Sequence, residues 1–341
     1  MKAQLEYSPP SLGQKTPLIP FIALLIALLA IGFAPILVRF SIAEIGANAT
    51  IFNRFWIAGL IFGIWNGVQT FGSKQASDET QNSSSETTSK AQQPYTLKTV
   101  VMLLLVGILL ALIQLLWAYS LTQTTVASSV TILHGLRPLL TTLGGWLLFK
   151  NRYDSRFLIG MTIAILGAIL LGFNDLSDSI DKFQGDLLSV LSAICSTLEL
   201  LIMERLVVNF KTQTLMLWCC IIGSLGMLAV LLFTSLFTTS VHFFPISWQE
   251  WGVVISLAFF SQVIGHGLIT YSLNYLSSGV VAVSMLLDPV ISALFAWIIL
   301  SEQVSIFNGL FCCIVLLGLY VSLSSKYAVK ADVALSEPLL S

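Results

Sequence analysis

Charged residues are scarce in this sequence, and their scarcity excludes an ordinary soluble domain. Only 10% of its 341 residues are Asp, Glu, Lys or Arg, and 56% are hydrophobic, whereas about 25% charged residues is usual for soluble domains. Such a chain cannot cover itself with polar surface. Its mean hydropathy is +0.89, and many apolar runs reach about 20 residues, enough to cross a hydrocarbon core of roughly 30 Å. These features predict a polytopic α-helical membrane protein.

The chain also lacks the residue patterns of several function classes. Its net charge is −1, and no basic cluster is interleaved with aromatic residues, so we expect no nucleic-acid partner. Its five cysteines lie in apolar runs without Cys-x-x-Cys spacing, which favours packing over metal or redox chemistry. No set of acids or histidines has the pattern of a catalytic or metal site, and we expect no enzyme activity, no metal and no cofactor.

What the chain does contain is one hydrophobic block in two copies. The first copy runs from Ser129 through Arg137-Pro138 to Trp146, and the second runs from Val280 through Asp288-Pro289 to Trp297. Pro138 falls on Pro289 at a separation of 151 residues, and Trp146 falls on Trp297 at the same separation. A charge next to a helix-breaking proline at bilayer depth, repeated in two halves, is typical of a transporter whose site lies between those halves.

Apolar runs separated by polar breaks predict ten membrane spans, five in each half. The expected spans are Leu18–Arg39, Thr50–Val68, Thr99–Leu121, Val126–Phe149, Phe157–Phe173, Asp186–Val207, Thr214–Phe237, Trp251–Leu273, Gly279–Leu300 and Ser305–Ser324. The predicted organisation is an N-terminal tail (1–17), a first repeat (18–173), a second repeat (184–324) and a C-terminal tail (325–341). A polar segment inside the first repeat, 72–93, is expected to be a flexible loop.

The basic residues predict the orientation of these spans. Twelve of the 16 Lys and Arg residues fall on the side of the two tails, so the positive-inside rule places both termini in the cytoplasm. Because each half has an odd number of spans, the second half enters the membrane from the opposite face. The predicted fold is therefore an all-α membrane protein with ten transmembrane helices arranged as two inverted five-helix repeats.

Three ionisable residues fall near the middle of expected spans: Arg137, Glu199 and Asp288. A charge at the bilayer midplane costs several kcal/mol unless it is paired or hydrated, so these side chains should face the interior. Polar neighbours one helical turn away extend each polar face. The predicted substrate-binding residues are Arg137, Asp288, Glu199, His134, Gln114, His266, Trp117, Ser284 and Ser292, with Gln114 and His266 at equivalent positions of the two repeats.

Two interpretations of these charges remain open. Arg137 and a carboxylate can form an internal ion pair that only fixes helix register, or Arg137 can anchor a substrate carboxylate while Glu199 or Asp288 holds an amino group or exchanges a proton. Pro138 and Pro289 can act as hinges or simply kink their helices. Arg54, near the start of its expected span, is interpreted as an anchor at the membrane boundary.

These blocks resemble the EamA branch of the drug/metabolite transporter superfamily, whose members have two five-helix repeats. The resemblance covers about residues 18–324 and is carried by Arg137-Pro138 through Trp146 and by Leu287-Asp288-Pro289 through Trp297 to Ser301-Glu302. The first repeat departs from the pattern at Lys150-Asn151. The resemblance implies transport of a small molecule without indicating which one.

The leading hypothesis is a secondary transporter that exports or exchanges a small organic metabolite by alternating access. One central arginine with carboxylates favours an amino-acid-like substrate, and the surplus carboxylate allows a proton as coupling ion. A phosphorylated-metabolite or nucleotide-sugar exchanger would need at least two buried basic groups, and only Arg137 is expected at the centre. A non-transporting scaffold or receptor in the bilayer is the third hypothesis.

Overall fold

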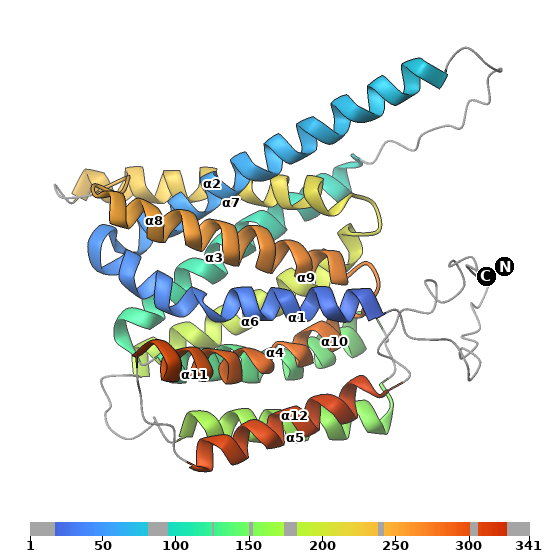
Figure 1. Cartoon of the computed structure of the whole chain (residues 1–341), viewed down its shortest axis with the longest axis vertical. Coiled ribbons are helices and arrows are strands. Elements are labelled where there is room, and N and C mark those ends of the chain that lie inside the picture. Colours follow the sequence, from blue (N-terminus) through green and yellow to red (C-terminus); the bar gives the residue numbers. More distant parts are fainter. Residues whose placement is uncertain are drawn as a thin grey trace.

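The structure, a computed structural model, describes residues 18–80, 95–124, 126–149, 153–173, 183–237, 242–300 and 306–325. Within these ranges every regular element is a helix, and the helices lie side by side with their axes in roughly one direction (Figure 1). The predicted tails lie outside the described residues except for Ser325.

The first two membrane crossings are joined almost without interruption. Helix α1 spans Leu18–Gly32, and α2 spans Ala34–Thr80 with a kink at Gly46. The apolar segment Leu18–Thr70 has 53 residues and would be about 80 Å long as one helix, more than twice the hydrocarbon thickness. It therefore crosses twice and reverses at Gly46, whose φ of 80° is one that glycine adopts without strain.

The remaining helices complete ten crossings within the described residues. The first repeat continues with α3 (Leu97–Gln123), α4 (Val126–Phe149) and α5 (Ser155–Phe173). The second repeat contains α6 (Phe183–Leu206), α7 (Thr212–Phe237), one crossing made of α8 (Trp248–Ser256), η2 (Leu257–His266) and α9 (Gly267–Ser272), another made of α10 (Ser278–Ser284) and α11 (Leu287–Leu300), and α12 (Ile306–Leu323). The predicted all-helical fold of two inverted five-helix repeats is confirmed.

One local expectation differs from the structure. Helix α2 continues to Thr80, so residues 72–80 are helical where a flexible loop was expected, and residues 81–93 lie outside the described ranges. Polarity alone does not end a helix that has already been nucleated, because each added residue gains a backbone hydrogen bond.

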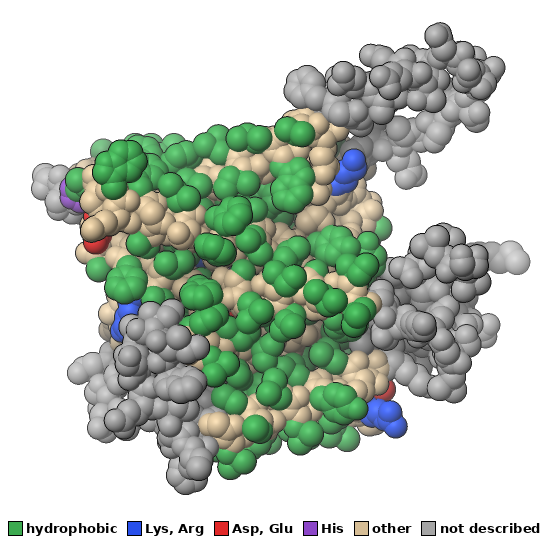
Figure 2. Space-filling model, in the orientation of Figure 1, with side chains coloured by type: hydrophobic (Ala, Val, Ile, Leu, Met, Phe, Trp, Pro, Cys, Tyr) green, Lys and Arg blue, Asp and Glu red, His purple; other side chains and the backbone are tan. Residues whose placement is uncertain are grey.

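The surface of the bundle is that of a protein in lipid. Figure 2 shows hydrophobic side chains covering the visible flank, with the charged side chains gathered at the two ends of the helices. Large apolar residues are exposed along most of the helices, as in Leu104, Leu147 and Phe233. The polar residues with low exposure are instead inside the bundle, where they build the site described below.

Helix packing follows the two-repeat relationship. Helix α6 packs against α3 and α4, and its counterpart α1 packs against η2, α9 and α11. Between α5 and α12 a Cβ at Gly167 would lie 2.8 Å from the backbone nitrogen of Val315, and a Cβ at Gly318 would meet the backbone of Ala164. At the separation of 151 residues these two contacts are the same contact made in both directions, as a two-fold relation requires.

The two repeats nevertheless differ in local helix geometry. Helix α4 runs unbroken through Pro138, whereas the equivalent crossing is divided into α10 and α11 at Met285-Leu286. Pro289 lies in the first turn of α11, where its missing N–H is not needed. The carbonyl of Met285 accepts a hydrogen bond from the Asp288 N–H at 3.0 Å, so the break between α10 and α11 does not leave this carbonyl unpaired.

Candidate functional site

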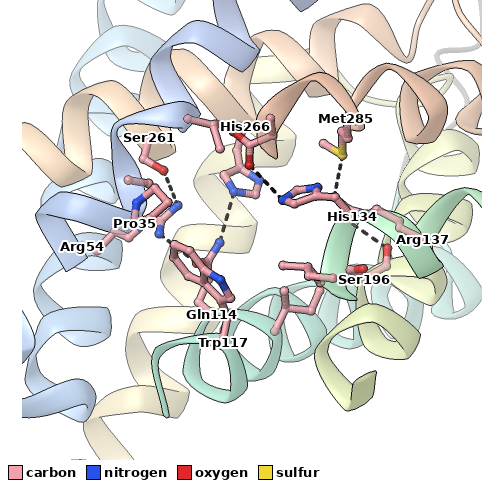
Figure 3. Close-up of a pocket in the computed structure, with 15 residues that line it drawn as sticks. Pro35, Arg54, Gln114, Trp117, His134, Arg137, Ser196, Ser261, His266 and Met285 are labelled. Carbon is pink, nitrogen blue, oxygen red and sulfur yellow. Dashed lines mark hydrogen bonds and ion pairs between the residues drawn. The ribbon is translucent and has the colours of Figure 1, made fainter. Parts of the chain in front are cut away.

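A cavity of about 50 Å³ lies between the two repeats, and Figure 3 shows it in close-up. Both repeats contribute to its walls. The lining residues are Ile31, Ala34, Pro35, Arg54, Ile113, Gln114, Trp117, Leu133, His134, Arg137 and Ser196, with Ser261, His266, Met285 and Asp288. Six of the nine residues predicted to bind substrate are among them: Arg137, Asp288, His134, Gln114, His266 and Trp117.

The two duplicated blocks cross at this cavity. His134 Nε2 on α4 lies 2.9 Å from Asp288 Oδ2 on α11, and an Arg137 guanidinium nitrogen lies 2.6 Å from Met285 Sδ. At a separation of 151 residues His134 is equivalent to Met285 and Arg137 to Asp288, so these are again one contact made in both directions. The approximate two-fold axis between the repeats therefore passes through the site.

Arg137 is buried but loosely bound. Its guanidinium lies 3.6 Å from a carboxylate oxygen of Glu199 and donates a long bond of 3.5 Å to the carbonyl of Ser196. Glu199, on α6, is buried and is not among the residues that line the cavity. Of the two predicted ion pairs for Arg137, the structure shows the one with Glu199, while Asp288 pairs with His134.

Arg54 was interpreted as a boundary anchor, and that prediction is wrong. Its side chain is 1% exposed and lines the cavity. It donates to Gln114 Oε1 at 2.8 Å, to Ser261 Oγ at 2.8 Å and to Gln262 Oε1 at 3.1 Å. The crossing begins after Gly46, so Arg54 lies about 12 Å along the helix rather than near its end. The centre therefore holds two arginines and two carboxylates.

Two equivalent residues of the repeats also meet directly. Gln114 Nε2 on α3 lies 3.1 Å from His266 Nε2 in the second repeat, which brings together the pair expected from the repeat. Ser261 was missed because η2 is a π-helix, in which residues five apart share a face, so that Ser261 and His266 both reach the cavity. An α-helical spacing of four residues from His266 would instead place Gln262 and Thr270 on the face shared with His266.

Four lining residues have a buried polar atom without a hydrogen-bond partner among the described residues. These atoms are Trp117 Nε1, His134 Nδ1, Arg137 Nε and Asp288 Oδ1. Buried polar groups are rarely left unpaired in folded proteins, since each unpaired group costs about 1–3 kcal/mol. All four atoms belong to residues that line one cavity, which indicates a place where a polar ligand or water is bound.

The predicted serines do not reach the cavity. Ser284 is buried and donates to the carbonyl of Val280 at 2.9 Å, and Ser292 donates to the carbonyl of Gly32 at 3.4 Å. Neither residue lines the cavity. Both hydroxyls are thus occupied by helix backbone, as serine and threonine hydroxyls often are in membrane helices.

Comparisons with known proteins agree with this architecture. A model of the EamA-like transporter family matches residues 18–173 and 183–324. A protein of Bacillus subtilis (strain 168) described as "Uncharacterized transporter YyaM" is 23% identical over 190 residues, which cover 55% of this chain and 61% of that protein. The match thus spans less than two thirds of the relative. A solved structure titled "Crystal structure of protein" has a TM-score of 0.65 at 16% identity and covers 89% of this chain and 96% of its own.

Proposed function

Because the chain belongs to the EamA-like transporter family, we propose that this membrane transporter is a secondary carrier that moves a small organic metabolite by alternating access. The family and the transporter relative identify a transporter and not an enzyme. We further propose that the metabolite is amino-acid-like or a related compound, and that the carrier exports or exchanges it.

One observation carries this proposal: the cavity at the contact of the two repeats is lined by residues of both repeats that have a buried polar atom without a partner among the described residues. Trp117, His134 and Arg137 come from the first repeat and Asp288 from the second. A ligand held by such groups would be bound at the place where relative motion of the repeats changes access from one side to the other.

The size of the cavity supports a moving carrier. At about 50 Å³ it has room for a few water molecules, whereas pockets for drug-sized ligands measure roughly 300–1,000 Å³. To load a metabolite the two repeats must separate on one side. The kinked α2 and the divided α10–α11 crossing offer joints for such a movement.

A proton remains the proposed coupling ion, but the observation that supports this proposal differs from the one expected from the sequence. The site contains a second arginine, Arg54, besides Arg137 and the two carboxylates, so the count of charges alone no longer calls for a proton. The contact of His134 Nε2 with Asp288 Oδ2 at 2.9 Å supports the idea in a different way, because an imidazole and a carboxylate can share a proton that a substrate displaces.

The test is transport by purified protein in liposomes. Vesicles loaded with a whole metabolite extract of small water-soluble compounds should lose a few of them faster than protein-free vesicles, as measured by mass spectrometry of the external medium. Vesicles with an Arg137→Gln, Asp288→Asn double variant serve as the inactive control. Loss of every compound at the protein-free rate would contradict the proposed function.

A further inference from the structure

The two arginines of the cavity differ in how their charges are balanced. Arg137 has the carboxylate of Glu199 within 3.6 Å. Arg54 forms no ion pair among the described residues, and its three hydrogen-bond acceptors are the neutral side chains of Gln114, Gln262 and Ser261. Both guanidinium groups are buried, so the charge of Arg54 is removed from water without a counter-ion.

A buried and uncompensated cation is costly, because the loss of hydration amounts to several kcal/mol even after relaxation of the protein. Neutral amide and hydroxyl acceptors return only part of that free energy. They do, however, fix the direction of the guanidinium: three of its five N–H groups are used, and two are left for another acceptor. An arginine that is oriented and unbalanced next to a cavity is suited to bind an anion.

The opposite side of the cavity has a different chemistry. Figure 3 shows Arg54 and Arg137 at opposite sides, with His266 and Gln114 between them. Asp288 contacts His134, which precedes Arg137 by one turn of α4, and its Oδ1 has no partner among the described residues. This side therefore presents a hydrogen-bond acceptor to a ligand.

We propose that the substrate carries one carboxylate, which binds to Arg54, and a hydrogen-bond donor, either an amino or a hydroxyl group, which binds to Asp288. The proposal rests on the proposed function and assigns its substrate class: small amino acids and hydroxy monocarboxylates. With Arg137 balanced by Glu199, the single free cation is Arg54 among the described lining residues. A phosphate monoester dianion carries more negative charge than Arg54 can balance. An organic cation would be repelled by the positive charge of Arg54.

The first test asks which compounds the unmodified carrier moves from the metabolite extract described above. The moved compounds should be carboxylates with a single net negative charge or zwitterions. Movement of organic cations, uncharged sugars or phosphate esters in their place would overturn the assignment while leaving the proposed carrier function intact. Movement of nothing would instead contradict the carrier function itself.

The second test assigns the carboxylate to Arg54. The most strongly moved carboxylate and its carboxamide are compared as inhibitors of uptake, and the unmodified carrier should prefer the acid by about tenfold or more, the value of a charge-assisted hydrogen bond. Arg54→Gln should bring this preference close to one, and Arg54→Lys should reduce the preference only in part, because the charge is kept while the planar guanidinium is lost. A purely structural role would weaken acid and amide equally.

Arg39→Gln is the matched control, since Arg39 is an exposed arginine on the same helix and its loss should leave the acid preference unchanged. Arg54→Gln protein that keeps the full preference for the acid would overturn the assignment. If Arg54→Gln does not fold, Arg54→Lys tests whether the carboxylate binds at this position. Lysine is shorter and lacks the planar guanidinium, so it should raise KM for the acid more than for the amide. An equal KM change for the two compounds would then reject the assignment.

Discussion

At the scale of single residues, the two oxygens of Asp288 have different surroundings. Oδ2 lies 2.9 Å from His134 Nε2, while Oδ1 is buried without a partner among the described residues, and Asp288 is one of the residues that line the cavity. Asp288→Asn keeps the shape but removes the charge, so we expect transport to fall about tenfold or more with an unchanged amount of inserted protein. Uptake by proteoliposomes measures this. Ser292→Ala, one turn further along α11, should transport normally, and normal transport by Asp288→Asn would contradict a role in binding.

Arg137 and Glu199 allow a test of a buried charge pair. Arg137→Gln leaves the Glu199 carboxylate without its cation, which costs about 3 kcal/mol when a buried pair is broken. We expect the melting temperature to fall in Arg137→Gln and to recover in part when Glu199→Gln is added, because the orphaned charge is then gone. Thermal unfolding in detergent provides the measurement. A double variant less stable than Arg137→Gln alone would show that the two residues are not coupled in this way.

The sequence identified the charged residues of both blocks, Arg137 and Asp288, but not Arg54, and the reason is geometric. A hydropathy reading begins the second span at Thr50, which puts Arg54 near an edge. In the structure the turn at Gly46 lets the helix start earlier. No periodicity reports such a turn, because a single glycine with positive φ leaves the apolar pattern on both sides unchanged. The same limit concealed Ser261, since π-helical spacing is not visible in composition.

At the scale of secondary structure, the ten spans were predictable because each needs a similar apolar length. The position at which a span is interrupted was not predictable. Such an interruption matters because it determines where a helix can bend when the repeats move. At a separation of 151 residues Gly135 on α4 is equivalent to Leu286, where the second repeat divides into α10 and α11. A Cβ at Gly135 would meet nothing within 4 Å, so packing does not require a glycine there. The conformational freedom of Gly135 suits a helix that breaks when the two repeats exchange conformations.

This reasoning predicts the effect of Gly135→Ala. Alanine stabilises a helix by about 1 kcal/mol over glycine, so α4 should resist breaking. We expect turnover to fall about fivefold with little change in KM and no loss of thermal stability. Kinetics of uptake and a melting curve measure both. Gly226→Ala on α7, where a Cβ also meets nothing within 4 Å, is the control and should keep full turnover. A Gly135→Ala carrier as fast as the control would refute a hinge at this position.

At the scale of the whole molecule, the first turn of α1 and the last turn of α12 lie at the same end of the bundle (Figure 1). Ten crossings require this arrangement, and it agrees with the inverted repeats. The structure gives the relation of the two ends to each other, whereas their side of the membrane follows from the basic residues in the connections. The described residues at the end shared by the two termini include the basic residues Lys98, Arg156, Arg205 and Lys211.

The orientation gives the last prediction, that both termini are cytoplasmic. In protein whose five native cysteines are replaced, Ser11→Cys should be protected from a membrane-impermeant thiol reagent in intact bacterial cells and labelled after permeabilisation. Ser177→Cys, in the connection between the repeats, should be labelled in both cases because an odd number of crossings separates it from the N-terminus. Labelling of Ser11→Cys in intact cells would contradict the predicted orientation. The end of the bundle that carries the two termini would then not be the face that takes up substrate from the cytoplasm.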